Sequence, residues 1–127
     1  MKKIGIIGAG NIGMAIAKGL VKQGAAKPSQ LLLSRKRNDL LALQEKEGFT
    51  VTDNQTLLAK CDVIILAVLP GQARDVILDL KPLFSVQEKL LVSVVSAVSI
   101  KELKEWSGLK TQVVRIMPNT AVEYGAS

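Results

Sequence analysis

Histidine is absent from the 127-residue chain, and cysteine and aromatic residues are scarce. Without histidine the chain cannot build a Ser-His-Asp triad, a histidine general acid or the usual histidine metal site. The single cysteine, Cys61, cannot form an internal disulfide, so we expect a reducing, cytoplasmic setting. Aromatic residues make up only 3% of a chain that is 48% hydrophobic, which predicts an aliphatic core around a parallel sheet. We assign no catalytic residue and no metal ligand, and expect a bound cofactor to supply any chemistry.

Long apolar runs are also lacking. The longest lie near residues 63–69 and 90–100, and they are too short and too interrupted to span a membrane. The net charge of +6 is compatible with nucleic-acid binding, but the basic residues are scattered apart from those at 35–37, and few aromatic residues are available for base stacking. We therefore expect neither a membrane nor a nucleic-acid partner.

Strand-like and helix-like patterns alternate along the chain. The predicted strands are residues 2–8, 30–35, 49–52, 62–68, 89–95 and 111–116. The predicted helices are residues 11–23, 38–47, 54–60, 71–82 and 99–106. This alternation predicts an α/β fold, a doubly wound parallel sheet of six strands in the order 3-2-1-4-5-6, with helices on both faces. The ligand crevice is then expected at the carboxyl ends of the first and fourth strands.

Several polar and small residues mark the expected helix ends. Gly24 and Gly48 follow the first two helices, as glycine C-terminal caps do. Asn38 and Asn54 are interpreted as N-caps. Pro70 and the glycine after it indicate a turn that ends the regular structure after the fourth strand.

The first strand runs directly into a GxGxxG motif formed by Gly8, Gly10 and Gly13. In a dinucleotide-binding loop the first glycine makes the tight turn, the second lets the backbone approach a pyrophosphate, and the third lets the helix pack on the strand. The helix that begins near Asn11 directs its N-terminal N–H groups and its dipole at that anion. The alternative interpretation is a strand-turn-helix that binds nothing.

The residues after the second strand indicate which dinucleotide binds. NAD-binding domains usually carry a carboxylate there, which would repel a 2′-phosphate. This chain has Ser34 and Arg35, followed by Lys36 and Arg37, and a hydroxyl with a guanidinium suits the 2′-phosphate. We therefore predict NADP(H). The alternative is that these residues are solvated loop cations.

The chain resembles the pyrroline-5-carboxylate reductase family over its whole length. The resemblance rests on IGIIGAGNIGMAIAKGL, on SR after the second strand, on CDVIILAVLP and SVVSAVSI, and most specifically on MPNT within the closing RIMPNTAVEYGA. It implies reduction of the C=N bond of 1-pyrroline-5-carboxylate to L-proline, usually with NADPH, in proline biosynthesis. It also implies that an all-helical domain follows the dinucleotide domain and builds the dimer and much of the substrate site.

The resemblance assigns a role to each matching segment. Ile7, Gly8, Ala9, Gly10, Asn11 and Ile12 would wrap the pyrophosphate. Ser34 and Arg35, with Lys36 behind them, would bind the 2′-phosphate, and Asn54 would face the adenosine. Ala67, Val68 and Pro70 would line the nicotinamide ribose crevice, and Ser96 and Ala97 would lie near the nicotinamide. Met117, Pro118, Asn119 and Thr120 would form the loop beneath the nicotinamide ring, with Asn119 and Thr120 adjacent to the substrate.

Five positions depart from the usual family pattern. The family commonly has Lys where this chain has Leu69, Ala-Gly where it has Ser96-Ala97, Pro where it has Ala121, and Met where it has Ile12. The loss of Lys at position 69 removes a phosphate or ribose contact, and Ala97 adds a Cβ in a tight place. These changes bear on affinity and substrate identity, whereas the nucleotide site itself is retained.

We interpret residues 1–127 as one dinucleotide-binding domain that lacks the helical domain of the family. Such a chain is expected to bind NADPH with little turnover and to be monomeric or weakly associated, whereas the complete enzyme would be a homo-oligomer that takes a small cyclic imine. Two alternatives stay open. One is a non-catalytic NADP-sensing or partner-binding module. The other is an NADP-dependent reductase of a related imine or another small substrate, including β-hydroxyacid and deazaflavin-linked reductases.

Overall fold

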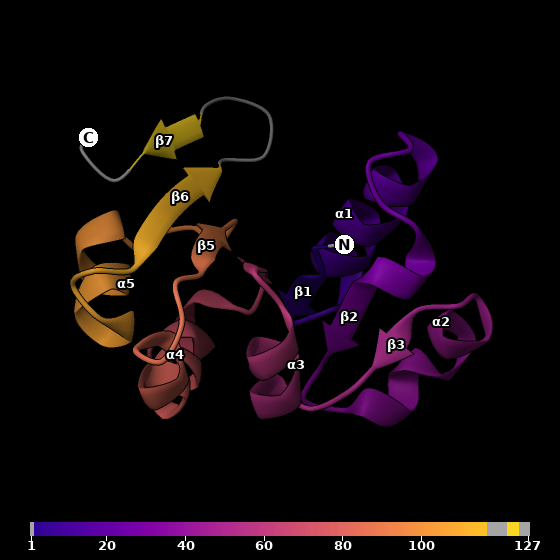
Figure 1. The fold of residues 1–127 in the computed structure, drawn as a ribbon, viewed down its shortest axis with the longest axis horizontal. Helices are drawn as coiled ribbons and strands as arrows, with labels where there is room; N and C mark the ends of the chain where they lie inside the picture. Colours follow the sequence, from indigo (N-terminus) through magenta and orange to yellow (C-terminus); the bar gives the residue numbers. More distant parts are fainter. Residues whose placement is uncertain (1, 117–121, 125–127) are drawn as a thin grey trace.

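Short apolar segments pair into a seven-stranded sheet that is flanked by helices in the computed structural model, which describes residues 2–116 and 122–124 (Figure 1). The strands are β1 (Ile4–Ile7), β2 (Leu31–Ser34), β3 (Thr50–Val51), β4 (Val63–Leu66), β5 (Leu90–Ser93), β6 (Gln112–Ile116) and β7 (Val122–Tyr124). The α-helices are α1 (Asn11–Lys22), α2 (Ala42–Lys46), α3 (Asn54–Lys60), α4 (Pro70–Phe84) and α5 (Ile100–Ser107). Two 3₁₀ helices, η1 (Pro28–Gln30) and η2 (Asn38–Leu41), precede β2 and α2.

The strand order is β3-β2-β1-β4-β5-β6-β7, and the first six strands are parallel. The predicted order and the predicted doubly wound fold are therefore confirmed. β1 lies between β2 and β4, with Ile7 opposite Ser34 on one side and Leu66 on the other. This register brings the loops after all three strands to one edge. The sequence did not predict β7, which pairs with β6 in the antiparallel direction.

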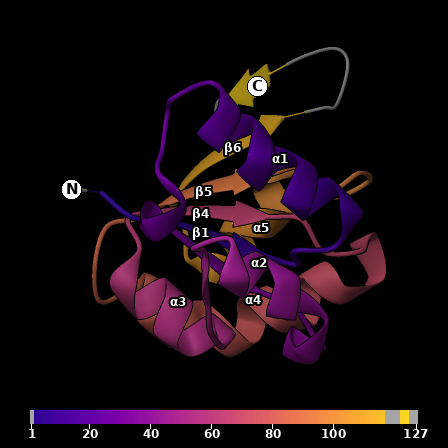
Figure 2. The same ribbon diagram turned by 90° about the vertical axis from the view of Figure 1, so that its right-hand side faces the viewer.

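Each face of the sheet carries its own apolar core. Alternation along β1 directs Ile6 into the core on the α1 side and Ile7 into the core formed with α3, α4 and α5. Figure 2 shows α1 on one side of the sheet and α3 and α4 on the other. Because both faces are covered, the central strands are apolar on both sides, which explains the continuous aliphatic runs in the sequence.

Helix α3 packs unusually close to β1 at Gly5. A Cβ on Gly5 would lie 2.2 Å from Cδ2 of Leu57 and 3.1 Å from Sγ of Cys61. Leu57 is fully buried, so its side chain has little room to move away. Glycine at this position therefore sets the distance between α3 and the sheet, and with it the position of the start of α3 beside β2.

The second predicted helix, over 38–47, is corrected to two shorter elements. The 3₁₀ helix η2 ends at Leu41, whose backbone (φ −103°, ψ 14°) departs from α-helical geometry, and α2 begins at Ala42. Leu41 is buried in the core on the α1 side, and the break lets its side chain reach that core. The fourth helix starts one residue earlier than expected, with Pro70 in its first turn, and continues through Pro82 to Phe84, which is buried.

Both predicted asparagine N-caps are wrong. Asp53 caps α3, because its carboxylate accepts a hydrogen bond from the backbone N of Thr56 at 2.7 Å, and Asn54 is the first helical residue. Arg37 precedes η2 without a side-chain cap, and Asn38 lies inside that helix. The glycine caps are confirmed, since Gly24 and Gly48 follow α1 and α2 with φ of +76° and +101°.

Candidate dinucleotide site

The glycine loop turns away from β1 at Gly8, which has a φ of +89°. The backbone N–H groups of Gly8 and Ala9 both donate to the carbonyl oxygen of Ser34, at 2.9 and 2.8 Å, so the loop is fastened to the end of β2. A Cβ on Gly8 would lie 2.8 Å from the backbone N of Val68. Glycine is therefore required both by the left-handed backbone and by the close approach of the chain after β4.

The other two motif glycines meet opposite surroundings. Nothing lies within 4 Å of a Cβ built on Gly10, so this side of the loop faces open space. A Cβ on Gly13 would lie 2.7 Å from the carbonyl oxygen of Gly8 and 3.2 Å from Cγ2 of Ile6. Gly10 therefore leaves room for an approaching ligand, whereas Gly13 permits the tight packing of α1 on β1, as a dinucleotide-binding loop requires.

Helix α1 begins directly at this open space. Gly10 is its N-cap and offers no side chain to the first turn, and the backbone N of Met14 makes the first helical bond, to Gly10 O at 2.9 Å. The N–H groups of the first turn have no hydrogen-bond acceptor within the helix, and they lie at the positive end of the helix dipole. Asn11 and Ile12 are exposed at this turn. The arrangement suits an anion such as a pyrophosphate.

Ser34 and Asn54, both predicted on the adenosine side, contact each other. The Ser34 hydroxyl donates to Oδ1 of Asn54, which joins the end of β2 to the start of α3. Ser34 itself is buried, with 1% of its surface exposed. Its hydroxyl is therefore committed to Asn54 in this structure, and Asn54 is held in place from the sheet side.

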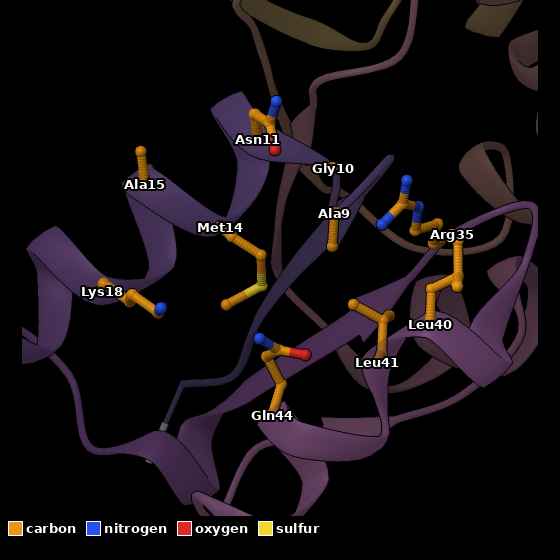
Figure 3. Close-up of a pocket in the computed structure, with 10 residues that line it drawn as sticks. All are labelled: Ala9, Gly10, Asn11, Met14, Ala15, Lys18, Arg35, Leu40, Leu41 and Gln44. Carbon is orange, nitrogen blue, oxygen red and sulfur yellow. The ribbon is translucent and has the colours of Figure 1, made fainter.

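The basic residues after β2 differ in their surroundings. Arg35, Lys36 and Arg37 are all exposed. Arg37 forms an ion pair with Asp39 at 2.8 Å, in which both side chains are more than 60% exposed (69% and 63%). Such an exposed pair contributes little to stability. Arg35 extends toward the glycine loop (Figure 3).

A cavity of about 400 Å³ lies between the glycine loop, α1 and the η2–α2 segment (Figure 3). It is lined by Ala9, Gly10, Asn11, Met14, Ala15, Lys18, Arg35, Leu40, Leu41 and Gln44. Four of these residues, from the glycine loop and the end of β2, belong to the predicted site. In the described part of the chain the side-chain oxygen of Gln44 is buried there without a hydrogen-bond partner.

Sequence reasoning missed the remaining lining residues of this cavity. Those on α1 had a usable signal, because Met14, Ala15 and Lys18 follow Asn11 at helical spacing and share its face. Those on η2 and α2 had none, since the helix was predicted with the wrong boundaries.

The predicted nicotinamide half of the site lies at the same edge of the sheet, outside this cavity. Ala67 follows β4, and its backbone N donates to Ile7 O at 2.8 Å, beside Val68 and Gly8. Pro70 opens α4, and the preceding Leu69 is 69% exposed. The loop after β5 exposes Ser96 and Ala97.

Ala97 has a left-handed backbone with a φ of +63°, the conformation that favours glycine. The strain at Ala97 therefore lies in the backbone, since its side chain is exposed. The predicted loop of Met117, Pro118, Asn119 and Thr120, together with Ala121, lies outside the described residues.

Metal and thiol chemistry find no support in the part of the chain that the structure describes. There, no group of three or more histidine, cysteine, aspartate or glutamate side chains could hold a metal ion. Burial raises the pKa of the Cys61 thiol to about 11, although Lys89 and Lys3 partly oppose this effect. A thiol in this state is unreactive at neutral pH. Over the same residues, no helix combines the length and the apolar character needed to cross a bilayer.

A parallel strand that leads through a glycine loop into a helix, at the point where the strand order reverses, defines a Rossmann-type dinucleotide-binding domain. Residues 3–97 match the family described as NADP oxidoreductase coenzyme F420-dependent, and the chain belongs to this family.

Individual relatives are pyrroline-5-carboxylate reductases. The chain is 35% identical to pyrroline-5-carboxylate reductase 2 of Dictyostelium discoideum, across 97% of its own length and 42% of that protein. The structure of a pyrroline-5-carboxylate reductase from Coxiella burnetii superposes with a TM-score of 0.87 at 31% identity, over 94% of this chain and 44% of that one. The Plasmodium falciparum pyrroline carboxylate reductase with NADP bound gives 0.79 at 29% identity, over 93% and 42%. The chain thus spans less than half the length of these relatives.

Proposed function

We propose that this chain is the NADPH-binding domain of an oxidoreductase that reduces 1-pyrroline-5-carboxylate to L-proline, in proline biosynthesis. The observation that carries the proposal is the similarity to pyrroline-5-carboxylate reductases along 97% of the chain, including its glycine loop. Residues 1–127 would form the dinucleotide domain, and a helical domain of the complete enzyme would supply most of the substrate site. The complete enzyme would be a homo-oligomer.

The residues present fit NADP(H). The loop from Ile7 to Ile12 leaves open space at Gly10 for the pyrophosphate, next to the start of α1. Ser34 and Arg35, with Lys36 behind them, would bind the 2′-phosphate, with the Ser34 hydroxyl turning from Asn54 to the phosphate, and Asn54 would face the adenosine. The nicotinamide half would be held by Ala67, Val68, Pro70, Ser96, Ala97, Met117, Pro118 and Asn119, with Asn119 and Thr120 beside the substrate. That NADP is bound by the similar Plasmodium falciparum enzyme supports this choice of cofactor.

In such an enzyme the cofactor supplies a hydride from C4 of its nicotinamide to the carbon of the C=N bond, while the nitrogen retains the proton of its iminium form. The chain's own residues would bind and orient the reactants rather than transfer protons. Ala67, Val68, Ser96 and Ala97 bring no acid or base to the crevice. We accordingly expect the chain to bind cofactor with little turnover of its own.

Calorimetric titration of the chain with NADPH and with NADH tests the binding part of the proposal. We expect NADPH to bind at least about tenfold more tightly, which corresponds to about 1.4 kcal/mol. Equal affinities would retain the dinucleotide domain but refute the 2′-phosphate assignment. No binding of either would refute the proposed function of the chain.

An NADPH-oxidation assay with 1-pyrroline-5-carboxylate tests the catalytic part. We expect a rate of NADPH oxidation far below that of a complete reductase of the family. A rate near that of the complete enzyme would refute the proposal that most of the substrate site lies in the helical domain.

The description of the matched family favours a second candidate, hydride exchange between NADP and coenzyme F420. Reduction of NADP by reduced F420, with no activity on the pyrroline, would favour that candidate.

The proposed location is the cytoplasm, and it is supported by the buried, unpaired thiol of Cys61. Fractionation of cells that express the protein tests this location.

A further inference from the structure

One face of α1 lines the cavity below the glycine loop. Asn11, Met14, Ala15 and Lys18 follow one another at spacings of three, one and three residues, so they lie along a single stripe of the helix. Figure 3 shows the Lys18 ammonium and the Arg35 guanidinium directed into the cavity from opposite sides, with Met14 between them. The two cations therefore belong to one cavity, although one comes from α1 and the other follows β2.

The charge lining this cavity has one sign. Lys18 and Arg35 are cationic, and none of the ten lining residues is aspartate or glutamate. In the described part of the chain, the nearby Asp39 pairs with Arg37, and Lys18 forms no ion pair. A concave surface that carries only positive charges on aliphatic walls raises the local concentration of anions.

The position of the cavity indicates which anion it would bind. It begins at Ala9, Gly10 and Asn11, where the pyrophosphate of a dinucleotide is expected. NADPH carries one further anionic group, the 2′-phosphate, which NADH lacks. The Ser34 hydroxyl carries no charge, so only cationic side chains can neutralise that phosphate.

We propose that Lys18 is a second cation of the 2′-phosphate subsite, opposite Arg35, and so determines specificity for NADPH over NADH. This inference rests on the proposed function, because it assumes a dinucleotide at the glycine loop. Lysine suits the role, since its flexible stem crosses the aliphatic wall at Met14 and delivers a point charge to the phosphate.

The experiment compares Lys18→Gln with Lys22→Gln, a matched control on the same helix whose residue is also exposed but does not line the cavity. Glutamine keeps a similar helix propensity at both positions. Each variant is titrated with NADPH, NADH and adenosine 2′-monophosphate at low and at high salt, and Arg35→Gln is the reference for a lost phosphate contact.

We expect Lys18→Gln to weaken the binding of NADPH and of adenosine 2′-monophosphate by about threefold to tenfold at low salt. The loss should be smaller at high salt, because salt screens the charges. NADH affinity should change by less than about twofold, and Lys22→Gln should leave all three ligands unchanged. If the parent chain prefers NADPH but Lys18→Gln behaves like Lys22→Gln, the inference is overturned while the proposed function stands. If the parent chain binds neither dinucleotide, both fail.

Discussion

At the scale of single residues, the motif glycines show that identical residues in one motif serve different contacts. Gly13 is needed for packing, because a Cβ there would lie 2.7 Å from a backbone oxygen. Gly10 meets no neighbour within 4 Å and is needed only if a ligand approaches. Stability and binding therefore depend on different glycines.

Substitution by alanine separates the two roles. Gly13→Ala is expected to lower the free energy of unfolding by about 1–3 kcal/mol, because the loop and the helix must move apart. Gly10→Ala is expected to change it by less than about 1 kcal/mol. The same Gly10→Ala variant should weaken the binding of NADPH by at least about tenfold, because its methyl group would occupy the space of the pyrophosphate. Urea unfolding and calorimetric titration of both variants measure these effects. A Gly10→Ala chain that binds NADPH like the parent would contradict the assignment of the open space.

The structure brings several residues of the predicted site together. Arg35 and the glycine loop share a cavity, and Ser34 and Asn54 come together as an adjacent pair. The cap of α3 was misassigned because Asp53 and Asn54 are neighbours with equal capping ability, and only the backbone turn decides which one precedes the helix. Lys18 was missed although its spacing from Asn11 places it on the same face of α1, because spacing alone does not show that this face lines a cavity.

At the scale of elements, α3 links stability to the adenosine side of the site. It is only seven residues long, so its first turn is a large part of it. Asp53 accepts hydrogen bonds from the backbone N and the hydroxyl of Thr56, at 2.7 and 3.0 Å, and these bonds hold the pKa of Asp53 below its usual value of 3.8. Asn54, which binds Ser34, lies within this turn.

We predict that Asp53→Ala speeds hydrogen exchange at the amide of Thr56 and in the rest of α3, because the capping acceptor is removed. Asp53→Asn should retain most of the protection, since the amide oxygen also accepts. Because the pKa of Asp53 is lowered on folding, its contribution to stability is present above pH 3.8 and is lost as the pH falls through the lower folded value. Hydrogen exchange of the α3 amides, measured by NMR at neutral and at acid pH, tests the effect of the substitutions and the effect of pH. Equal protection of Thr56 in all three chains would show that the cap is irrelevant.

At the scale of the whole molecule, Cys61 reports on the integrity of the fold. Its side chain is 1% exposed, within the core shared by α3, α4 and α5. Burial raises its pKa from 9.0 to about 11. Above pH 9 the unfolded chain releases the thiol proton while the folded chain retains it, so folding stability falls as the pH rises from 9 toward 11.

Urea unfolding of the parent and of Cys61→Ser between pH 7 and pH 11 tests this linkage. Serine does not titrate in this range, whereas the lysines titrate in both chains. The parent should lose stability more steeply than the variant above pH 9, and parallel curves would contradict the prediction.

By itself, the sequence determined the class of fold and the position of the glycine loop. Apolar periodicity and glycine spacing act between residues close in the chain, and the rules for parallel sheets then leave few possible strand orders. Tertiary structure alone decided the contacts between distant segments: the hydrogen bond from Ser34 to Asn54, the approach of α3 to Gly5 and the cavity between α1 and α2. It also decided that the three residues of β7 form a strand, because so short a segment has no period of its own and gains its hydrogen bonds only by pairing with β6. Such contacts depend on where complete elements pack, which no local pattern records.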